Sequence, residues 1–137
     1  SDVWGRMTES NKTILPRALW QTWITREDLR ANRDVVYVFG DNVARDGRRG
    51  LARHLRHEPN THAISISWGP FEPFSYATID EAKTQIDADL LNLAARNASL
   101  IVWPHAGLLE PFMDVPQEIR EYLRQEVGLR FHIQLPG

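Results

Sequence analysis

The residues best suited to chemistry lie close together between Gly40 and Arg56. An acid and an amide, Asp41 and Asn42, follow a glycine, and a run of arginines broken by further glycines comes next. A carboxylate can orient a ribose hydroxyl or a water, and arginine forms paired, charge-assisted hydrogen bonds with phosphate. Glycine lets the main chain approach a ligand closely. This stretch predicts a site for a phosphate-bearing small molecule.

The predicted site has two groups of residues. The expected ligand-binding residues are Gly40, Asp41, Asn42, Arg45, Gly47, Arg48, Arg49, Gly50, Arg53, Trp68 and Trp103. The candidates for a catalytic role, including hydrolysis, are Asp41, Asn42 and His105, the last because it follows a predicted buried strand. The two tryptophans end predicted strands, where an indole could stack on a base.

Every one of these residues also has a structural interpretation. The glycines can serve tight turns, and the arginines can form a solvated helix face. Asp41 in a Gly-Asp-Asn turn can hold its own backbone, His105 can be structural, and the tryptophans can fill the core. No nucleophile or general base has a partner at a diagnostic spacing, so the sequence leaves catalysis open.

The composition narrows the remaining function classes. The chain has 137 residues, no cysteine and a formal net charge of −2, while five arginines against one aspartate stand between residues 45 and 57. Because the chain has no cysteine, disulfides and thiolate metal sites are excluded. His54, His57 and His62 lack the spacing of a zinc site, and neither a metal nor a cofactor is expected. No apolar run approaches membrane-spanning length, so we expect a cytoplasmic protein without membrane contact.

Hydrophobic patterning positions the candidate site within alternating elements. We expect strands over residues 18–24, 35–39, 63–68, 99–103 and 129–133, and helices over 26–32, 50–58, 79–96 and from Pro116 to Gly128. Gly40 is expected to end the second strand. Thr25 with Asp28, and Thr78 with Glu81, have the spacing of capping boxes. The 69–77 stretch is expected to be a loop with aromatic anchors.

Alternation of strands and helices predicts an α/β fold. We expect a three-layer sandwich with a mostly parallel central sheet of about five strands, Rossmann-like or macrodomain-like. Residues 13–137 form a single domain in this interpretation, after a flexible tail over 1–12. Ligands of such sheets bind beyond the carboxyl ends of the strands, where the 40–50 loop belongs.

One long stretch resembles a family of small uncharacterised bacterial and phage proteins. The shared elements are Val38-Phe39-Gly40-Asp41-Asn42, the Gly47–Gly50 loop, Ala52 with Arg56, and Glu58-Pro59-Asn60. The resemblance implies a Rossmann-like or macrodomain-like fold; in macrodomains, a similar Asn and Gly-rich loop hold ADP-ribose. Ser67-Trp68 and the segment from His105 to Phe112 depart from the family, which usually has a lysine and a second glycine-rich turn there.

Three functions follow from these observations. The first is binding of a nucleotide or ADP-ribose-type ligand in a phage or bacterial accessory role. The alternative is a non-catalytic interaction protein whose basic Arg45–Arg56 face binds an acidic protein or a nucleic acid. The third is an accessory protein that acts by docking, as a homodimer formed through the edge strand that contains Trp20 and Trp23.

Overall fold

A computed structural model describes residues 15–47, 50–109 and 113–136. The elements, in chain order, are β1 (Arg17–Gln21), α2 (Arg26–Ala31), β2 (Val36–Asn42), α3 (Gly50–Leu55), β3 (Thr61–Gly69), β4 (Glu72–Pro73), the 3₁₀ helix η1 (Tyr76–Thr78), α4 (Ile79–Ala95), β5 (Leu100–Pro104) and α5 (Gln117–Phe131). The expected α/β class is confirmed. The predicted tail over 1–12 lies outside the described residues.

Five strands form one sheet in the order β1-β5-β2-β3-β4. β1 pairs with β5, β5 with β2, and β2 with β3, all in parallel. The two-residue β4 joins the end of β3 in antiparallel orientation. The sheet is therefore mixed, and the prediction of a mostly parallel, Rossmann-like sheet is not confirmed. The four parallel strands nevertheless bring their carboxyl ends to one edge.

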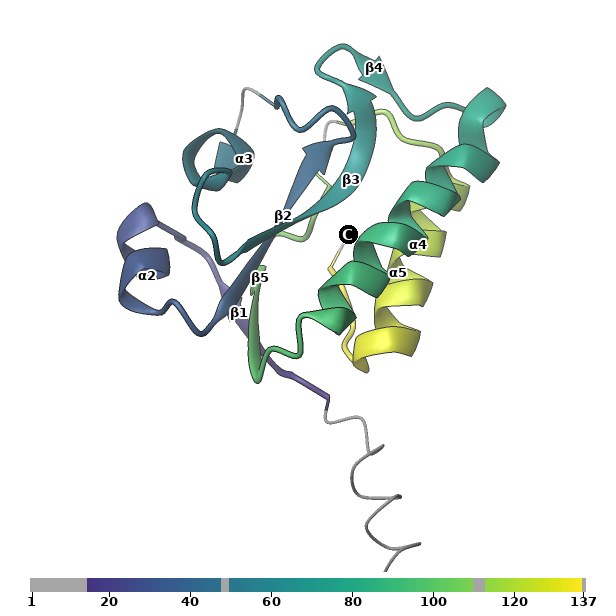
Figure 1. The fold of residues 1–137 in the computed structure, drawn as a ribbon. Coiled ribbons are helices and arrows are strands. Elements are labelled where there is room, and N and C mark those ends of the chain that lie inside the picture. Colours follow the sequence, from purple (N-terminus) through teal and green to yellow (C-terminus); the bar gives the residue numbers. More distant parts are fainter. Residues whose placement is uncertain (1–14, 48–49, 110–112, 137) are drawn as a thin grey trace, which may run out of the picture.

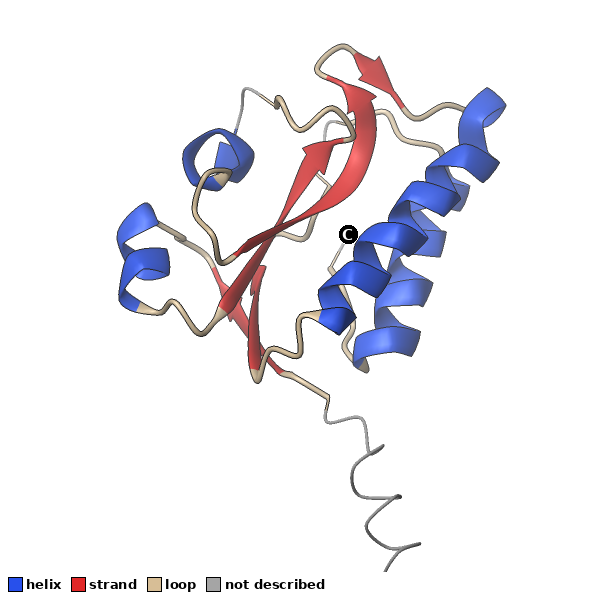
Figure 2. Cartoon of the chain, in the orientation of Figure 1, coloured by secondary structure: helices blue, strands red, loops and turns tan. Residues whose placement is uncertain are grey.

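Helices cover the two faces of this sheet unequally, as Figures 1 and 2 show. The long helices α4 and α5 lie side by side on one face. Their buried residues, among them Ile86, Leu90 and Leu123, form the larger hydrophobic cluster with Val38 and Trp103. The short α2 and α3 lie on the other face. Among the described residues, no helix is long and apolar enough to cross a membrane.

A smaller cluster fills the α2 and α3 face and fixes these short helices. It is built from Ile24, Leu29, Tyr37, Phe39, Ala52, Leu55 and Val102. α2 begins with the predicted capping box, in which Asp28 N–H donates to the Thr25 hydroxyl and Thr25 N–H donates to the Asp28 carboxylate. Neither helix is long enough to be stable alone in water, so packing against β2 supplies their stability.

Two sequence-based boundaries and one predicted helix cap are wrong. β2 continues through Gly40 to Asn42, because the side chains of Asp41 and Asn42 find partners while buried. α5 does not end at Gly128 but continues to Phe131, and His132 then ends it in a left-handed conformation (φ 55°). The strand expected over residues 129–133 therefore does not form. Thr78 does not cap α4 with its side chain; its hydroxyl instead accepts a hydrogen bond from Trp68 Nε1.

Candidate functional site

Asp41, at the carboxyl end of β2, is the centre of the candidate site, and its side chain is completely buried. Its Oδ1 accepts hydrogen bonds from the main-chain N–H groups of Asn42 (2.8 Å) and Gly47 (3.1 Å). Arg56, which directly follows α3, donates from Nε to Asp41 Oδ2 at 3.1 Å and from Nη2 to Gly47 O at 2.7 Å. One buried ion pair therefore holds the 43–47 loop against α3.

Two of the predicted glycines are required by close approaches. A Cβ at Gly47 would lie 2.5 Å from Asp41 Oδ1. A Cβ at Gly40 would lie 2.5 Å from the main-chain oxygen of Leu108 and 2.9 Å from the side chain of Ile66. Real Cβ atoms do not come this close to other heavy atoms. Gly40 therefore lets the loop after β5 pack onto β2, and Gly47 makes room for the Asp41 clamp.

Arg45 connects the same loop to α4. The residue has a positive φ of 58°, and its Nη2 lies 2.9 Å from Asp89 Oδ1. Asp89 Oδ2 accepts a hydrogen bond from the main-chain N–H of Ser65 at 2.7 Å. Next to this pair, burial lowers the pKa of His62, whose Nε2 lies 2.8 Å from the main-chain oxygen of Asp89. These bonds fix the position of the Arg45 guanidinium.

A cavity of about 500 Å³ opens between the 43–47 loop and α3. Its lining residues are Arg45, Asp46, Gly47, Arg53, Arg56 and His57. Arg45 and Arg56 are held by their carboxylate partners, whereas Arg53 is exposed and forms no ion pair within the described part of the chain. Arg53 therefore offers an anion in this cavity a guanidinium that no described carboxylate pairs with, beside two guanidinium groups held in place by Asp89 and Asp41.

The structure brings together some of the predicted site residues. Arg45, Gly47 and Arg53 line the cavity, Asp41 lies behind it, and Gly50 opens α3 beside it with a positive φ of 60°. Arg48 and Arg49 lie outside the described residues. Asn42 is buried, and its side-chain oxygen accepts a hydrogen bond from Asp46 N–H at 3.1 Å, which closes the loop.

The remaining predicted residues are placed elsewhere. Trp103 is buried between Trp20 and Phe131, with ring centroids 6.2 and 5.6 Å away. Trp68 packs edge-on against Phe74 at 5.0 Å. His105 is exposed, and its main-chain N–H donates to Gln21 O at the end of β1. None of these three side chains lines the cavity.

The loop after β5 contacts the chain's own C-terminal segment. Gly107 has a positive φ of 90°, and a Cβ there would lie 2.6 Å from the main-chain oxygen of Pro136. Leu108 and Leu135 are both buried. Residues near the C-terminus therefore pack against the loop in which the family resemblance implied a second glycine-rich turn.

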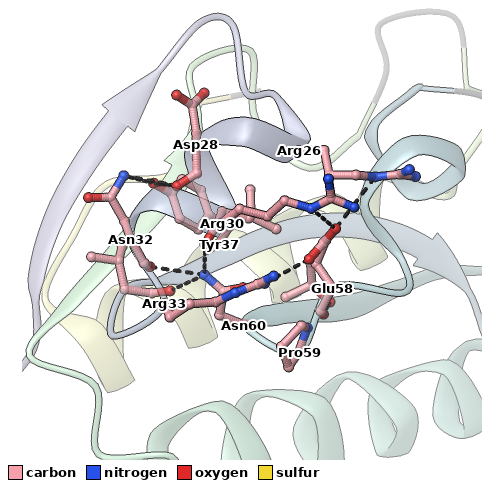
Figure 3. Close-up of polar contacts among 12 residues, drawn as sticks. Arg26, Asp28, Arg30, Asn32, Arg33, Tyr37, Glu58, Pro59 and Asn60 are labelled. Atoms are coloured by element: carbon pink, nitrogen blue, oxygen red, sulfur yellow. Dashed lines mark hydrogen bonds and ion pairs between the residues drawn. The ribbon is translucent and has the colours of Figure 1, made fainter.

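Sequence reasoning missed a second arginine cluster, at the opposite end of β2 and β3 (Figure 3). Glu58 is almost fully buried and receives three guanidinium groups: Arg26 at 3.5 Å, Arg30 at 3.1 Å and Arg33 at 2.7 Å. The hydrogen bond from Arg33 is the main cause that lowers the pKa of Glu58. Arg26 and Arg30, four residues apart and so on one side of α2, were the available signal, whereas Arg33 follows the helix.

Asn60 completes this cluster. Its side-chain nitrogen lies 3.0 Å from each of three main-chain oxygens, those of Leu29, Asn32 and Val35. Its side-chain oxygen accepts a hydrogen bond from Arg33 at 2.9 Å. Glu58 and Asn60 of the Glu-Pro-Asn motif therefore tie the end of α2 and the start of β2 to the start of β3, which is a structural role.

The comparisons with known proteins identify a family. The model of a family of unknown function, DUF7831, matches residues 19–118, so the chain belongs to that family. The matched range contains both the cavity and the Glu58–Asn60 cluster. Neither a curated protein nor a solved structure matches the chain.

Proposed function

We propose that this protein binds a phosphate-bearing small molecule, of nucleotide or ADP-ribose type, in the cavity between the 43–47 loop and α3. The observation that supports this most strongly is the convergence of Arg45, Arg53 and Arg56 on one cavity of about 500 Å³. That volume lies within the range of small-molecule sites, roughly 300–1,000 Å³. Guanidinium groups bind phosphate through paired hydrogen bonds.

The position of the cavity in the fold favours the same function. It is lined by the loop that follows the carboxyl end of β2, a position where α/β sheets commonly bind ligands. The parallel arrangement of β1, β5, β2 and β3 is also the feature on which a Rossmann-like or macrodomain-like relationship would rest. The mixed sheet and the loop after β5 are its departures from that pattern.

The existing contacts would prepare the cavity for an anion. Arg45 and Arg56 are already held by Asp89 and Asp41, so little side-chain entropy is lost when they contact a ligand. Arg53 has no carboxylate partner in the described chain, so a bound phosphate would supply its first ion pair there. Binding is proposed without hydrolysis, because Asp41 is fully occupied by the loop and Arg56.

Calorimetric titration with pyrophosphate, ADP-ribose, NAD and the common nucleotides tests this function. The wild type should bind at least one of them. Arg53→Gln should weaken that binding by about 10- to 100-fold, since one charge-assisted hydrogen bond contributes about 1.5–3 kcal/mol. Arg17→Gln, which removes an exposed charge on β1 far along the sheet, is the matched control and should bind normally. Absence of binding by every compound would refute the proposal.

A second function, docking of a nucleic acid or an acidic protein, has one specific observation in its favour. Arg26 of α2 donates to the main-chain oxygen of His54 on α3 at 2.7 Å. The exposed arginines of α2 therefore continue the basic Arg45–Arg56 face. Binding of this kind should weaken steeply as salt rises, and it should increase with the length of an oligonucleotide, whereas a cavity ligand should show neither trend to the same degree.

A further inference from the structure

β1 is the outer strand of the sheet, and its free side can be identified from two main-chain hydrogen bonds. Arg17 N–H donates to Ser99 O, and His105 N–H donates to Gln21 O, so residues 17 and 21 face β5. The N–H and C=O groups of one residue in a parallel ladder point to the same side. Ala18 and Trp20 consequently direct their main-chain groups away from the sheet.

Exposed apolar side chains surround this free side at a regular spacing. Leu15, Leu19 and Trp23 are 38%, 49% and 84% exposed. Leu19 lies within β1, whereas Leu15 and Trp23 lie just beyond its two ends, Trp23 after a bend at Thr22. Trp20 points to the other face, where it packs against Trp103. Within the described part of the chain, the outer strand thus combines main-chain groups that have no partner with exposed apolar side chains, the combination that folded proteins usually protect from association.

We propose that β1 pairs with β1 of a second copy of this chain, antiparallel and about a two-fold axis at Leu19. Ala18 of one copy would form two main-chain hydrogen bonds with Trp20 of the other. The two-fold axis would produce a second, equivalent pair, in which Trp20 of the first copy bonds to Ala18 of the other. Leu19 would face its own equivalent as the close, non-hydrogen-bonded pair between them. The two sheets would become one continuous sheet.

The sequence around Leu19 is self-complementary in this register, which favours a second copy over another protein. Leu19 of each copy covers Leu19 of the other, and Leu15 of each copy comes to the end of the strand from which Trp23 of the other emerges. Arg17 falls opposite Gln21 and no like charges meet. The side-chain nitrogen of Gln21 is used by Trp23 O and Asp28, which leaves its oxygen as the acceptor for Arg17. Two-fold dimers require such a patch to match itself.

Sedimentation equilibrium of the full chain tests the proposal, which is independent of the cavity. The wild type should be a dimer at micromolar concentration. Leu19→Lys would place two ammonium groups together on the axis and should raise the dissociation constant by about tenfold or more. Leu91→Lys, at a 63% exposed position on α4, is the control and should remain dimeric. Ala18→Pro removes an outward N–H without touching the β5 ladder and should also yield monomers.

A cross-link gives a second readout that does not depend on affinity. The chain has no cysteine, so Leu19→Cys introduces the only thiol. Facing residues of a close antiparallel pair have the separation that a disulfide needs, and mild oxidation should convert Leu19→Cys to a covalent dimer while Leu91→Cys stays largely monomeric. A monomeric wild type at all concentrations, or a dimer that survives both Leu19→Lys and Ala18→Pro, would overturn the proposal.

Discussion

The two buried carboxylates Asp41 and Glu58 both form ion pairs with arginine, but they lie at opposite ends of the sheet. Glu58 lies at the amino ends of β2 and β3, where three guanidinium groups surround it and Asn60 bonds to three main-chain oxygens. Asp41 lies at the carboxyl end of β2 with one arginine and two main-chain N–H groups. Only the Asp41 end adjoins the described cavity.

The difference shows how similar residues can produce a rigid corner or the wall of an open cavity. At Glu58 all three arginines point to one carboxylate, which offsets one of their three positive charges. At Asp41 the single clamp shapes a loop, while Arg45 and Arg53 reach the cavity from separate elements. The number of arginines, three at each end, does not separate the two regions. The free space beside the Asp41 clamp is what favours that end for ligand binding.

The largest effect is expected from Asp41→Ala. This change leaves Arg56 without its buried partner and removes the acceptor of two loop N–H groups. Breaking a buried ion pair costs about 3–5 kcal/mol, and urea denaturation should show a loss of this size. Asp46→Ala, which removes an exposed carboxylate from the same cavity, should change the free energy of unfolding by less than about 0.5 kcal/mol. Equal effects of the two changes would refute the clamp.

Asn60→Ala should destabilise the other end by about 2 kcal/mol, because the two N–H donors of its amide, which three main-chain oxygens share, are lost at about 1 kcal/mol each. Ligand affinity at the cavity should be unchanged as long as the protein is folded. Asn92→Ala, on the exposed side of α4, is the matched control for the urea measurement. A variant that stays stable but loses ligand binding would contradict the division between the two ends.

Gly47→Ala should cost about 1–3 kcal/mol, since the new Cβ would overlap Asp41 Oδ1 and force the clamp apart. It should also weaken ligand binding, because the main chain of Gly47 lines the cavity. Gly69→Ala meets nothing nearer than 3.9 Å and should behave like the wild type in thermal unfolding. If both alanines were equally tolerated, the loop would not be held as described.

The smallest effect is expected from pH at the Glu58 end. The folded protein lowers the pKa of Glu58 from 4.5, chiefly through the hydrogen bond from Arg33. The unfolded chain therefore binds more protons in acid, and stability falls as the pH drops through 4.5 towards the lower folded pKa. Glu58→Gln should flatten this acid limb in denaturation curves taken between pH 3 and 6. If the stability of Glu58→Gln still fell between pH 6 and 3 as steeply as that of the wild type, groups other than Glu58 would be responsible for the loss in acid.

Much of the fold could be predicted from local patterning. The apolar runs before Gly40 and Pro104 predicted β2 and β5, and Thr25 with Asp28 predicted the start of α2. The boundaries failed where tertiary contacts decide. Asp41 and Asn42 stay in the strand because the loop supplies hydrogen-bond partners, and the helix continues through Gly128 because its neighbours Val127 and Phe131 are buried.

The candidate site was only partly open to sequence reasoning. The Gly-Asp-Asn run and the arginines after it predicted a basic loop beside a helix, and Arg45, Gly47 and Arg53 do line one cavity. The partners of Asp41, Arg45 and Glu58 are 15, 44 and 25–32 residues away along the chain. Pairs at such distances follow from how strands and helices pack, which no local pattern encodes.

The central claim, that the Asp41 end binds a phosphate-bearing ligand and the Glu58 end does not, is tested most directly by NMR titration of ¹⁵N-labelled protein with ADP-ribose and with pyrophosphate. The predicted result is a saturable shift of the Arg45 and Gly47 amides and the Arg53 side chain, with Arg33 and Asn60 unmoved. Saturable shifts at Arg26, Arg30 and Arg33 with a silent Gly47 would contradict the account.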